Sequence, residues 1–395
     1  MIHETSWDVI VLGAGAAGLM CAGEAGRRGR RVLVVDHAAQ PGQKIRISGG
    51  GRCNVTNRTL GKEFYLSEHP GFCTAALRQF GAGDILRRLA QAGIAVEERQ
   101  AGQCFCVGSA QQVVQLLLDA CAAAQVRFSL GNPLQRVERK EGGFVLHTQA
   151  GVLTCSSLVM ATGGLSFPKL GASDVGHRLA RQWGLPVVPP RPALVPLLLP
   201  RAGFLAAESL AGISVEAILH GGKARFSGPL LFTHRGVSGP VVLQISSHWR
   251  EGETLRINLL PGVDLGQLFA RARQSHPRQE VATLLAQWLP KRLVQALLGH
   301  LALTGRIAEL ADARLRLLAS AVQDWRVVPT GSEGYRTAEV TAGGVDTRSF
   351  SPKSMACRTI PGLYCVGEVM DVTGQLGGYN LQWAWSSGYA AGQWA

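Results

Sequence analysis

Asp8-Val9-Ile10-Val11-Leu12, an apolar run typical of a buried strand, leads directly into Gly13-Ala14-Gly15-Ala16-Ala17-Gly18. A helix of small residues follows, and then a second apolar strand, 31–35, which ends in Asp36. Gly13 allows a tight turn, Gly15 lets a pyrophosphate approach the backbone, and Gly18 lets the helix pack close to the sheet. The helix N-terminus offers free N–H groups to the anion, and Asp36 can accept a hydrogen bond from a ribose 2′-hydroxyl. The segment predicts a dinucleotide site without specifying which dinucleotide.

The composition predicts a folded, soluble, cytoplasmic protein. A chain of 395 residues is long enough for two or three domains. We expect no signal peptide before the first strand, and no apolar run is long enough to span a membrane. Nine scattered cysteines, an odd number, favour reduced thiols over a disulfide framework. We expect no metal site, because Cys104 and Cys106 are too close together for a zinc knuckle and lack a partner pair.

The formal net charge of +13 is high for an enzyme of small neutral metabolites. It fits either a general bias of an arginine-rich sequence or contact with a polyanionic partner such as RNA. The basic residues are scattered along the chain, as shown by Arg27, Arg28, Arg30, Arg31, Arg87, Arg88, Lys291 and Arg292. A nucleic-acid surface would therefore have to form in three dimensions.

The order of elements indicates an α/β fold with a doubly wound, dinucleotide-binding domain that is split by an insertion. Strands and helices alternate up to a proline cluster at 186–192, which indicates a domain exit. Residues 191–262 have the pattern of a small β domain, and residues 263–324 have leucines at helical spacing. Strand patterns return after Asp324, so we expect the first domain to comprise 1–190 and 325–395.

Three features favour FAD over NAD as the resident cofactor. An acid ends the second strand, which suits an unphosphorylated ribose. A late strand ends in Gly367-Glu368, which resembles the Gly-Asp segment of glutathione-reductase-like flavoproteins, with Asp371 as the alternative acid. Gly378-Tyr379-Asn380-Leu381 then begins the last helix, whose N-terminus would stabilise the negative charge of a reduced flavin. An ordinary glycine-rich helix start is the alternative for this last segment.

Four blocks, at 44–57, 231–240, 334–345 and 362–388, resemble the BaiN/YhiN-like flavoproteins. The YhiN branch, associated with dihydrouridine formation in 23S ribosomal RNA, is the most similar. The resemblance implies a glutathione-reductase-type FAD domain with inserted β-barrel-like and small helical domains. It also implies tightly bound FAD, with NADH or NADPH as electron donor. Arg46 departs from the family pattern, in which apolar residues are common at this place.

The residues expected to contact the cofactor share a position at the end of a strand, in a glycine-rich loop or at the start of a helix. They are Gly13, Gly15, Ala16, Ala17, Gly18, Asp36, Lys44, Ser48, Gly49, Gly50, Gly51, Arg52, Cys53, Asn54, Ala161, Thr162, Gly163, Gly164, Gly367, Glu368, Asp371, Gly378, Tyr379, Asn380 and Leu381.

The chain has one complete fingerprint, so we expect NAD(P)H to dock transiently and leave. Reduction of uridine would then place a hydride on C6 and a proton on C5. Cys53 is the candidate proton donor, or alternatively a buried packing residue. Arg52 is expected to bind a cofactor phosphate or a substrate carbonyl. Tyr379 is a candidate ring near the isoalloxazine, and His234 and Arg235 are expected either to contact the substrate or to form a structural turn.

The lead hypothesis is therefore an FAD enzyme that reduces a uridine in ribosomal RNA. A flavoenzyme for a small metabolite, either a reductase of an enone or bile-acid-type C=C bond or an oxidase of an amino-ketone, is the second hypothesis. A flavin-bearing RNA-binding factor is the third.

Overall fold

The apolar run at 8–12 lies in β1 (Ser6–Leu12), at the middle of a seven-stranded sheet. In this computed structural model, which describes residues 6–202, 204 and 210–395, β1 pairs in parallel with β2 (Val32–Val35) and β10 (Gly151–Met160). β7 (Arg127–Ser129) and β20 (Leu363–Cys365) extend the parallel part, whereas β9 (Gly143–Thr148) and β8 (Leu134–Lys140) continue it as an antiparallel hairpin. The parallel strands confirm the predicted α/β fold with a doubly wound, dinucleotide-binding domain, which is of the Rossmann type.

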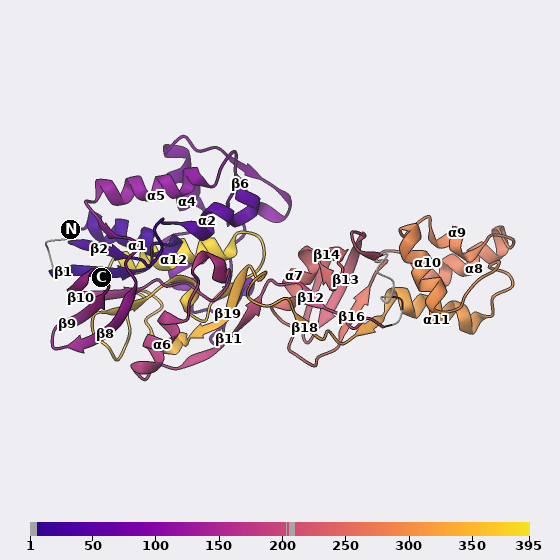
Figure 1. Cartoon of the computed structure of the whole chain (residues 1–395). Coiled ribbons are helices and arrows are strands. Elements are labelled where there is room, and N and C mark those ends of the chain that lie inside the picture. Colours follow the sequence, from indigo (N-terminus) through magenta and orange to yellow (C-terminus); the bar gives the residue numbers. More distant parts are fainter. Residues whose placement is uncertain (1–5, 203, 205–209) are drawn as a thin grey trace. The chain divides into compact units, whose positions relative to one another are not determined.

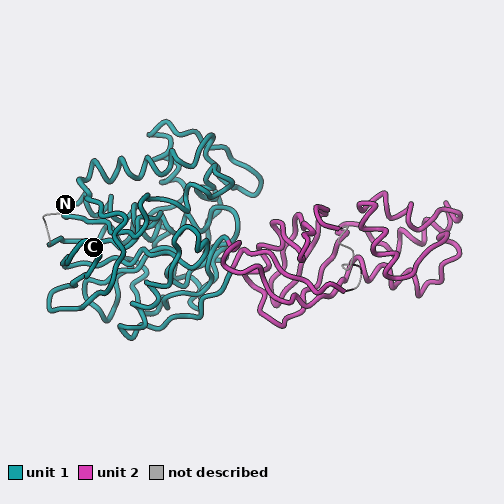
Figure 2. The backbone as a smooth tube through the Cα atoms, in the orientation of Figure 1, with its two compact units in different colours: residues 1–192, 339–395 teal, residues 193–338 magenta. Residues whose placement is uncertain are grey.

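The chain forms two units, coloured separately in Figure 2: residues 1–192 with 339–395, and residues 193–338. Unit 1 contains the seven-stranded sheet and its helices (Figure 1). Its remaining elements are α2 (Gln43–Ile47), β3 (Asn54–Asn57), β4 (Tyr65–Leu66), α3 (Thr74–Gln79), α4 (Ala82–Gln91), β5 (Val96–Glu98), β6 (Gln103–Cys106), α6 (Val175–Gln182), β11 (Val187–Ala193), β19 (Val340–Val345) and β21 (Thr373–Gly374).

Helix α1 (Ala16–Arg27) contacts β1 and β2 and packs against both α5 (Gln111–Ala123) and α12 (Tyr379–Gly392). Residues 17–25 of α1 are all buried, as are most residues of α12. The two helices meet at backbone distance, because a Cβ on Gly388 would lie 2.4 Å from the Ala17 carbonyl oxygen. Helix α12 therefore packs directly against helix α1.

Unit 2 contains an antiparallel sheet and a group of helices that share one hydrophobic core. The strands are β12 (Leu197–Leu198), β13 (Ser214–Gly221), β14 (Ala224–Phe232), β15 (Gly236–Ser238), β16 (Leu255–Asn258), β17 (Trp325–Val327) and β18 (Gly331–Ser332). The helices are α7 (Pro240–Ser246), α8 (Leu265–Ser275), α9 (Val281–Leu285), α10 (Lys291–His300) and α11 (Asp312–Gln323).

The predicted return to the first domain at residue 325 is too early. β17 pairs with β16, and β18 pairs with β12, so these strands complete the inserted sheet. The return comes at Glu339. Strand patterns after Asp324 could not show the boundary, because both units contain strands and the pairing partner is distant in sequence. The predicted 191–262 and 263–324 segments form one unit, since Leu219 and Leu297 belong to the same core.

All nine cysteines are buried and free. None of the helices in the described part of the chain has the length and apolarity that crossing a membrane requires.

Buried polar side chains of α12 hold it against β3. The Gln382 amide donates to the Phe80 carbonyl (3.0 Å) and accepts from the Thr56 hydroxyl (2.5 Å). The β3–β6 ladder has an irregularity between Asn54 and Thr56, and the Val55 carbonyl there accepts a hydrogen bond from the Trp385 indole (2.8 Å). The helix therefore satisfies a carbonyl that the irregular ladder leaves open.

Replacing Trp385 by Phe should lower the free energy of unfolding by about 1–3 kcal/mol, because it leaves the buried Val55 carbonyl without its donor. Equilibrium urea denaturation measures the change. Trp394 is half-exposed and serves as the matched control, whose replacement by Phe should change stability by less than about 0.5 kcal/mol. Equal effects of the two substitutions would contradict this role for Trp385.

Candidate functional site

The turn between β1 and α1 brings three backbone segments into contact. Gly13 has φ 112°, and a Cβ there would lie 2.3 Å from the Ala161 carbonyl oxygen at the end of β10. A Cβ on Gly18 would lie 1.9 Å from the Gly13 carbonyl oxygen. Only glycine fits at both positions, so α1 begins directly above the sheet edge.

The N-terminus of α1 is open to a ligand. Gly15 is its N-cap without a side-chain hydrogen bond, and a Cβ on Gly15 would meet nothing within 4 Å. The backbone N–H groups of Gly15, Ala16 and Ala17 have no hydrogen-bond partner among the described residues. Free N–H groups beside open space suit an anion such as a pyrophosphate.

Asp36 lies beside this turn at the end of β2. Its Oδ2 accepts from the Ala14 N–H (2.6 Å), and its Oδ1 accepts from the Ala38 N–H (2.8 Å). The two bonds hold the carboxylate at the glycine turn, where an acid that binds a ribose is expected.

Lys44 and Glu368 join segments that are far apart in the sequence. The Lys44 ammonium lies 2.5 Å from Glu368 Oε2, and Glu368 Oε1 accepts from the Thr341 N–H (2.9 Å). A Cβ on Gly164 would lie 2.6 Å from the same Oε1. Four segments therefore lie next to one another at the ion pair. They are α2, β19, the Thr162-Gly163-Gly164 segment and the 3-10 turn Gly367–Val369.

The residues of α12 position that 3-10 turn. The Gly367 N–H donates to the Ser387 hydroxyl (3.0 Å), and the Trp383 indole donates to the Gly367 carbonyl (3.0 Å). The Asn380 side chain bonds both backbone groups of Gly374, at 2.8 Å each. α12 therefore both begins at the site and holds the Glu368 segment in place.

The loop 48–53 exposes glycine backbone and the positively charged side chain of Arg52 to solvent. Gly49 and Gly50 are exposed, and the exposed Arg52 guanidinium bonds to no residue that the structure describes. Cys53 is completely buried, and burial raises the pKa of its thiol to about 12. Arg52 is thus available to an anionic or carbonyl ligand, whereas the Cys53 thiol stays protonated at neutral pH.

Two other predicted residues are engaged inside unit 1. The Tyr379 ring is stacked on Phe64 (centroids 4.8 Å apart), and burial raises the pKa of its hydroxyl to about 12. The Asp371 carboxylate accepts from the Glu68 N–H (2.8 Å), and burial raises its pKa. Of the two acids considered for the late strand, Glu368 lies beside Thr162-Gly163-Gly164, and Asp371 holds the 67–68 loop.

His234 and Arg235 lie in unit 2, on the exposed turn between β14 and β15. The Thr233 hydroxyl accepts from the N–H groups of Arg235 (3.3 Å) and Gly236 (3.1 Å). These hydrogen bonds stabilise the turn, and neither the His234 nor the Arg235 side chain takes part in them.

Sequence patterns did not assign two polar residues of this region, Thr341 and His177. Thr341 accepts from the Leu165 N–H (2.8 Å) through its hydroxyl, and block 334–345 was the only signal for it. Thr162, which the sequence did predict as a cofactor contact, has a buried hydroxyl without a partner in the described residues, next to Gly176. His177 is buried, neither of its ring nitrogens has a well-formed hydrogen bond to a described residue, and burial lowers its pKa. Nothing in the sequence around His177 distinguishes it from an ordinary helix residue.

Known proteins resemble this chain over nearly its full length. The family model of the HI0933-like protein Rossmann domain matches residues 7–394. A ribosomal RNA dihydrouridine synthase of Escherichia coli is 48% identical over 393 residues, 98% of this chain and 97% of that protein. A 3-dehydro-bile acid delta(4,6)-reductase of Clostridium scindens is 31% identical over 399 residues, 97% of each chain. Among solved structures, a Mycobacterium smegmatis Sdh1 complex in the apo form has a TM-score of 0.51 at 18% identity, covering 98% of this chain and 67% of that one, which shows a shared fold.

His177 should make stability depend on pH below about 6.5. Its lowered pKa means that the unfolded chain binds a proton more readily than the folded protein. The contribution is therefore complete above the unfolded pKa and is lost as the pH falls toward the folded value.

Urea midpoints at about pH 8 and about pH 5.5 test this against a His177→Gln variant, which should lose less stability on acidification. His276→Gln changes an exposed histidine and should keep the wild-type pH dependence. The same acid sensitivity in all three proteins would exclude His177 as its source.

Proposed function

Because this chain belongs to the HI0933-like Rossmann family, we propose that it is an FAD-dependent oxidoreductase that reduces the C5=C6 bond of a uridine in 23S ribosomal RNA to dihydrouridine. The observation that carries the proposal is the full-length similarity to a ribosomal RNA dihydrouridine synthase. A Haemophilus influenzae protein of the same name is 43% identical over 389 residues. These matches confirm the family resemblance drawn from the sequence blocks. The net charge of +13 agrees with a polyanionic substrate.

The geometry of unit 1 supports FAD as the cofactor. The N–H groups of Gly15, Ala16 and Ala17 would bind the pyrophosphate, and Asp36 would bind the ribose of the adenosine half. The Glu368 segment and the start of α12 would lie along the flavin half. Bound FAD would supply hydride transfer, with NADH or NADPH as the donor. Since the sequence has one fingerprint, the nicotinamide nucleotide would bind transiently.

The side chains at the site have distinct proposed tasks. The Lys44–Glu368 pair holds the cofactor segments together. Arg52 presents an exposed guanidinium that can donate two parallel hydrogen bonds to a phosphate or a single one to a uracil carbonyl. A proton must also reach C5, and Cys53 is the candidate that sequence reasoning names. Its buried thiol is a weak acid, which favours a packing role for this residue.

A reductase of a small enone is the second candidate function. The bile-acid reductase of Clostridium scindens, at 31% identity, is the observation that favours it. The higher identity to the ribosomal RNA enzymes and the basic charge favour RNA. A flavin-bearing RNA-binding factor would bind ribosomal RNA but leave its uridines unreduced.

Gly15→Ala should weaken FAD binding without unfolding the protein. The added methyl group enters the open space at the α1 N-terminus, and the extended backbone at Gly15 accommodates alanine. We expect FAD affinity to fall by at least about tenfold, a loss of about 1.4 kcal/mol, measured by flavin fluorescence titration of the apoprotein. Gly18→Ala is the contrast, because its Cβ clashes with Gly13 and should lower the melting temperature even without FAD. Unchanged FAD affinity in Gly15→Ala would contradict the site.

The same variant tests the function in cells. 23S ribosomal RNA from a strain that lacks the gene should lose dihydrouridine, as measured by mass spectrometry of nucleosides. The wild-type gene should restore it, and the Gly15→Ala gene should restore less. Dihydrouridine that persists without the gene would refute the proposed substrate.

Cys53→Ala distinguishes between the two possible roles of the thiol, proton donation and packing. If Cys53 delivers the proton, the variant should retain its flavin absorbance and lose turnover, because a methyl group cannot donate. Single-turnover reoxidation of the flavin by RNA measures the step. Full turnover together with a lower melting temperature would assign Cys53 to packing.

A further inference from the structure

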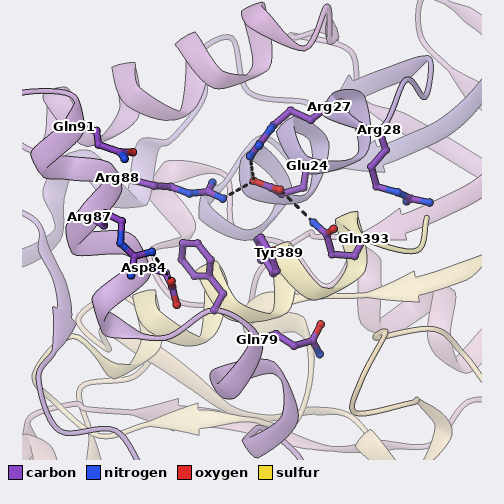
Figure 3. A pocket seen from close by; sticks show the side chains of 11 residues that line it. Glu24, Arg27, Arg28, Gln79, Asp84, Arg87, Arg88, Gln91, Tyr389 and Gln393 are labelled. Atoms are coloured by element: carbon purple, nitrogen blue, oxygen red, sulfur yellow. Dashed lines mark hydrogen bonds and ion pairs between the residues drawn. The ribbon is translucent and has the colours of Figure 1, made fainter.

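Four arginines that are scattered in the sequence line one hollow of unit 1 (Figure 3). Arg27 and Arg28 come from the end of α1, and Arg87 and Arg88 come from α4. Helix α1 rises about 18 Å over its length, so the hollow lies at the opposite end of α1 from the candidate dinucleotide site. The site described above uses none of these four residues.

The buried carboxylate of Glu24 organises the floor of the hollow. Its side chain is only 6% exposed, and its Oε1 lies 2.7 Å from Arg88 Nη2. The Gln393 amide donates to the other oxygen (3.2 Å). The Arg88 guanidinium also lies over the rings of Phe80 (4.8 Å) and Tyr389 (5.8 Å). Paired in this way, the buried acid fixes one arginine in a single orientation.

The outer arginines remain open to solvent. The side chains of Arg27 and Arg87 are 60% and 66% exposed, and their bonds to Glu24 (3.4 Å) and Asp84 (3.0 Å) use only part of each guanidinium. One nitrogen of Arg28 donates to the carbonyl oxygens of Gly392 (3.1 Å) and Ala395 (3.2 Å). Among the described residues, four arginines and two acids line the hollow, so this lining carries a net charge of +2. Their unused N–H groups suit the oxygens of phosphates.

The hollow continues into a second one, which shares Arg27, Arg88 and Gln91 with it. None of the described residues that line this second part is acidic, and its wall contains small residues such as Gly26, Gly29, Ala120 and Ala123. The two hollows form an elongated surface, here called the arginine groove. An extended polyanion can follow such a groove, whereas a single small anion would fill only part of it.

We propose that the arginine groove binds backbone phosphates of the ribosomal RNA substrate, outside the nucleotide that is reduced. The inference rests on the proposed function and adds a second contact surface to it. Arginine forks match phosphates, and the aromatic rings of the groove lie under Arg88 rather than open to a base. The groove therefore positions the RNA and does not recognise its sequence.

The arginines also have a structural contribution that an experiment must separate from RNA binding. Arg27 and Arg88 lie in the last turns of α1 and α4, where a cation stabilises the helix dipole. The exposed pair Arg27 and Arg87 is the informative choice, because Arg88 is needed to compensate the buried Glu24.

The test is an Arg27→Gln/Arg87→Gln double variant of the full, FAD-loaded protein. Binding to protein-free 23S ribosomal RNA from a strain without the gene is measured across salt concentration. Two lost phosphate contacts should lower the slope of log affinity against log salt by about 1.5, so that between about 50 and 200 mM salt the variant loses roughly tenfold less affinity than wild type. For dihydrouridine formation, KM for RNA should rise while kcat and flavin content stay as in wild type. The melting temperature should fall by no more than a few degrees, because Arg27 also stabilises the end of α1.

Arg136→Gln/Arg139→Gln is the control, because it removes the same charge from exposed positions of β8. This control should bind RNA as wild type does. Equal weakening by both double variants, or no weakening by the groove variant, would overturn the groove while leaving the enzymatic function intact. A wild-type protein that forms no dihydrouridine would instead refute the proposed function. If the wild-type protein binds inorganic pyrophosphate saturably and the groove variant does not, the ligand of the groove is a small anion and the proposal of RNA binding is wrong.

Discussion

Backbone-to-backbone packing around the first half of α1 is the constraint on which the site depends. Gly13 meets the end of β10, Gly18 meets Gly13, and Gly388 of α12 meets Ala17, each at a distance that excludes a side chain. This packing sets the start of α1 at the carboxyl edge of the parallel strands and leaves its first N–H groups free. The remaining parts follow from it, since α12, once docked on α1, holds the Gly367 turn through Trp383 and Ser387.

Charge is arranged differently at the two ends of α1. At its N-terminus, free N–H groups and the helix dipole favour an anion, and the side chains nearby are small. Its C-terminus is the negative end of the helix dipole, and arginines supply positive charge there, around the buried Glu24. In the account proposed here, the first end holds the cofactor phosphates and the second holds phosphates of the RNA. Under the two proposals, the same helix would link the reaction centre to an outer contact with the substrate.

Local patterns in the sequence predicted those features of the fold that depend on residues close together in the chain. The Gly13–Gly18 turn, the parallel strands and Asp36 follow from spacing and hydrophobicity over a few tens of residues. Contacts between distant segments were not predictable in this way. The domain return at Glu339, the bond between Thr341 and the Leu165 N–H, and the burial of His177 depend on which strand or helix arrives from far along the chain. The arginines at 27 and 87 appeared scattered for the same reason.

The most direct measurement is reconstitution with purified components. Unmodified 23S ribosomal RNA is incubated with the FAD-loaded protein and NADH or NADPH, and its nucleosides are analysed by mass spectrometry. We expect one uridine site to gain two hydrogens, in an amount that matches the nicotinamide consumed. RNA that binds to the protein but remains unreduced, under conditions in which the flavin is reduced, would contradict the account.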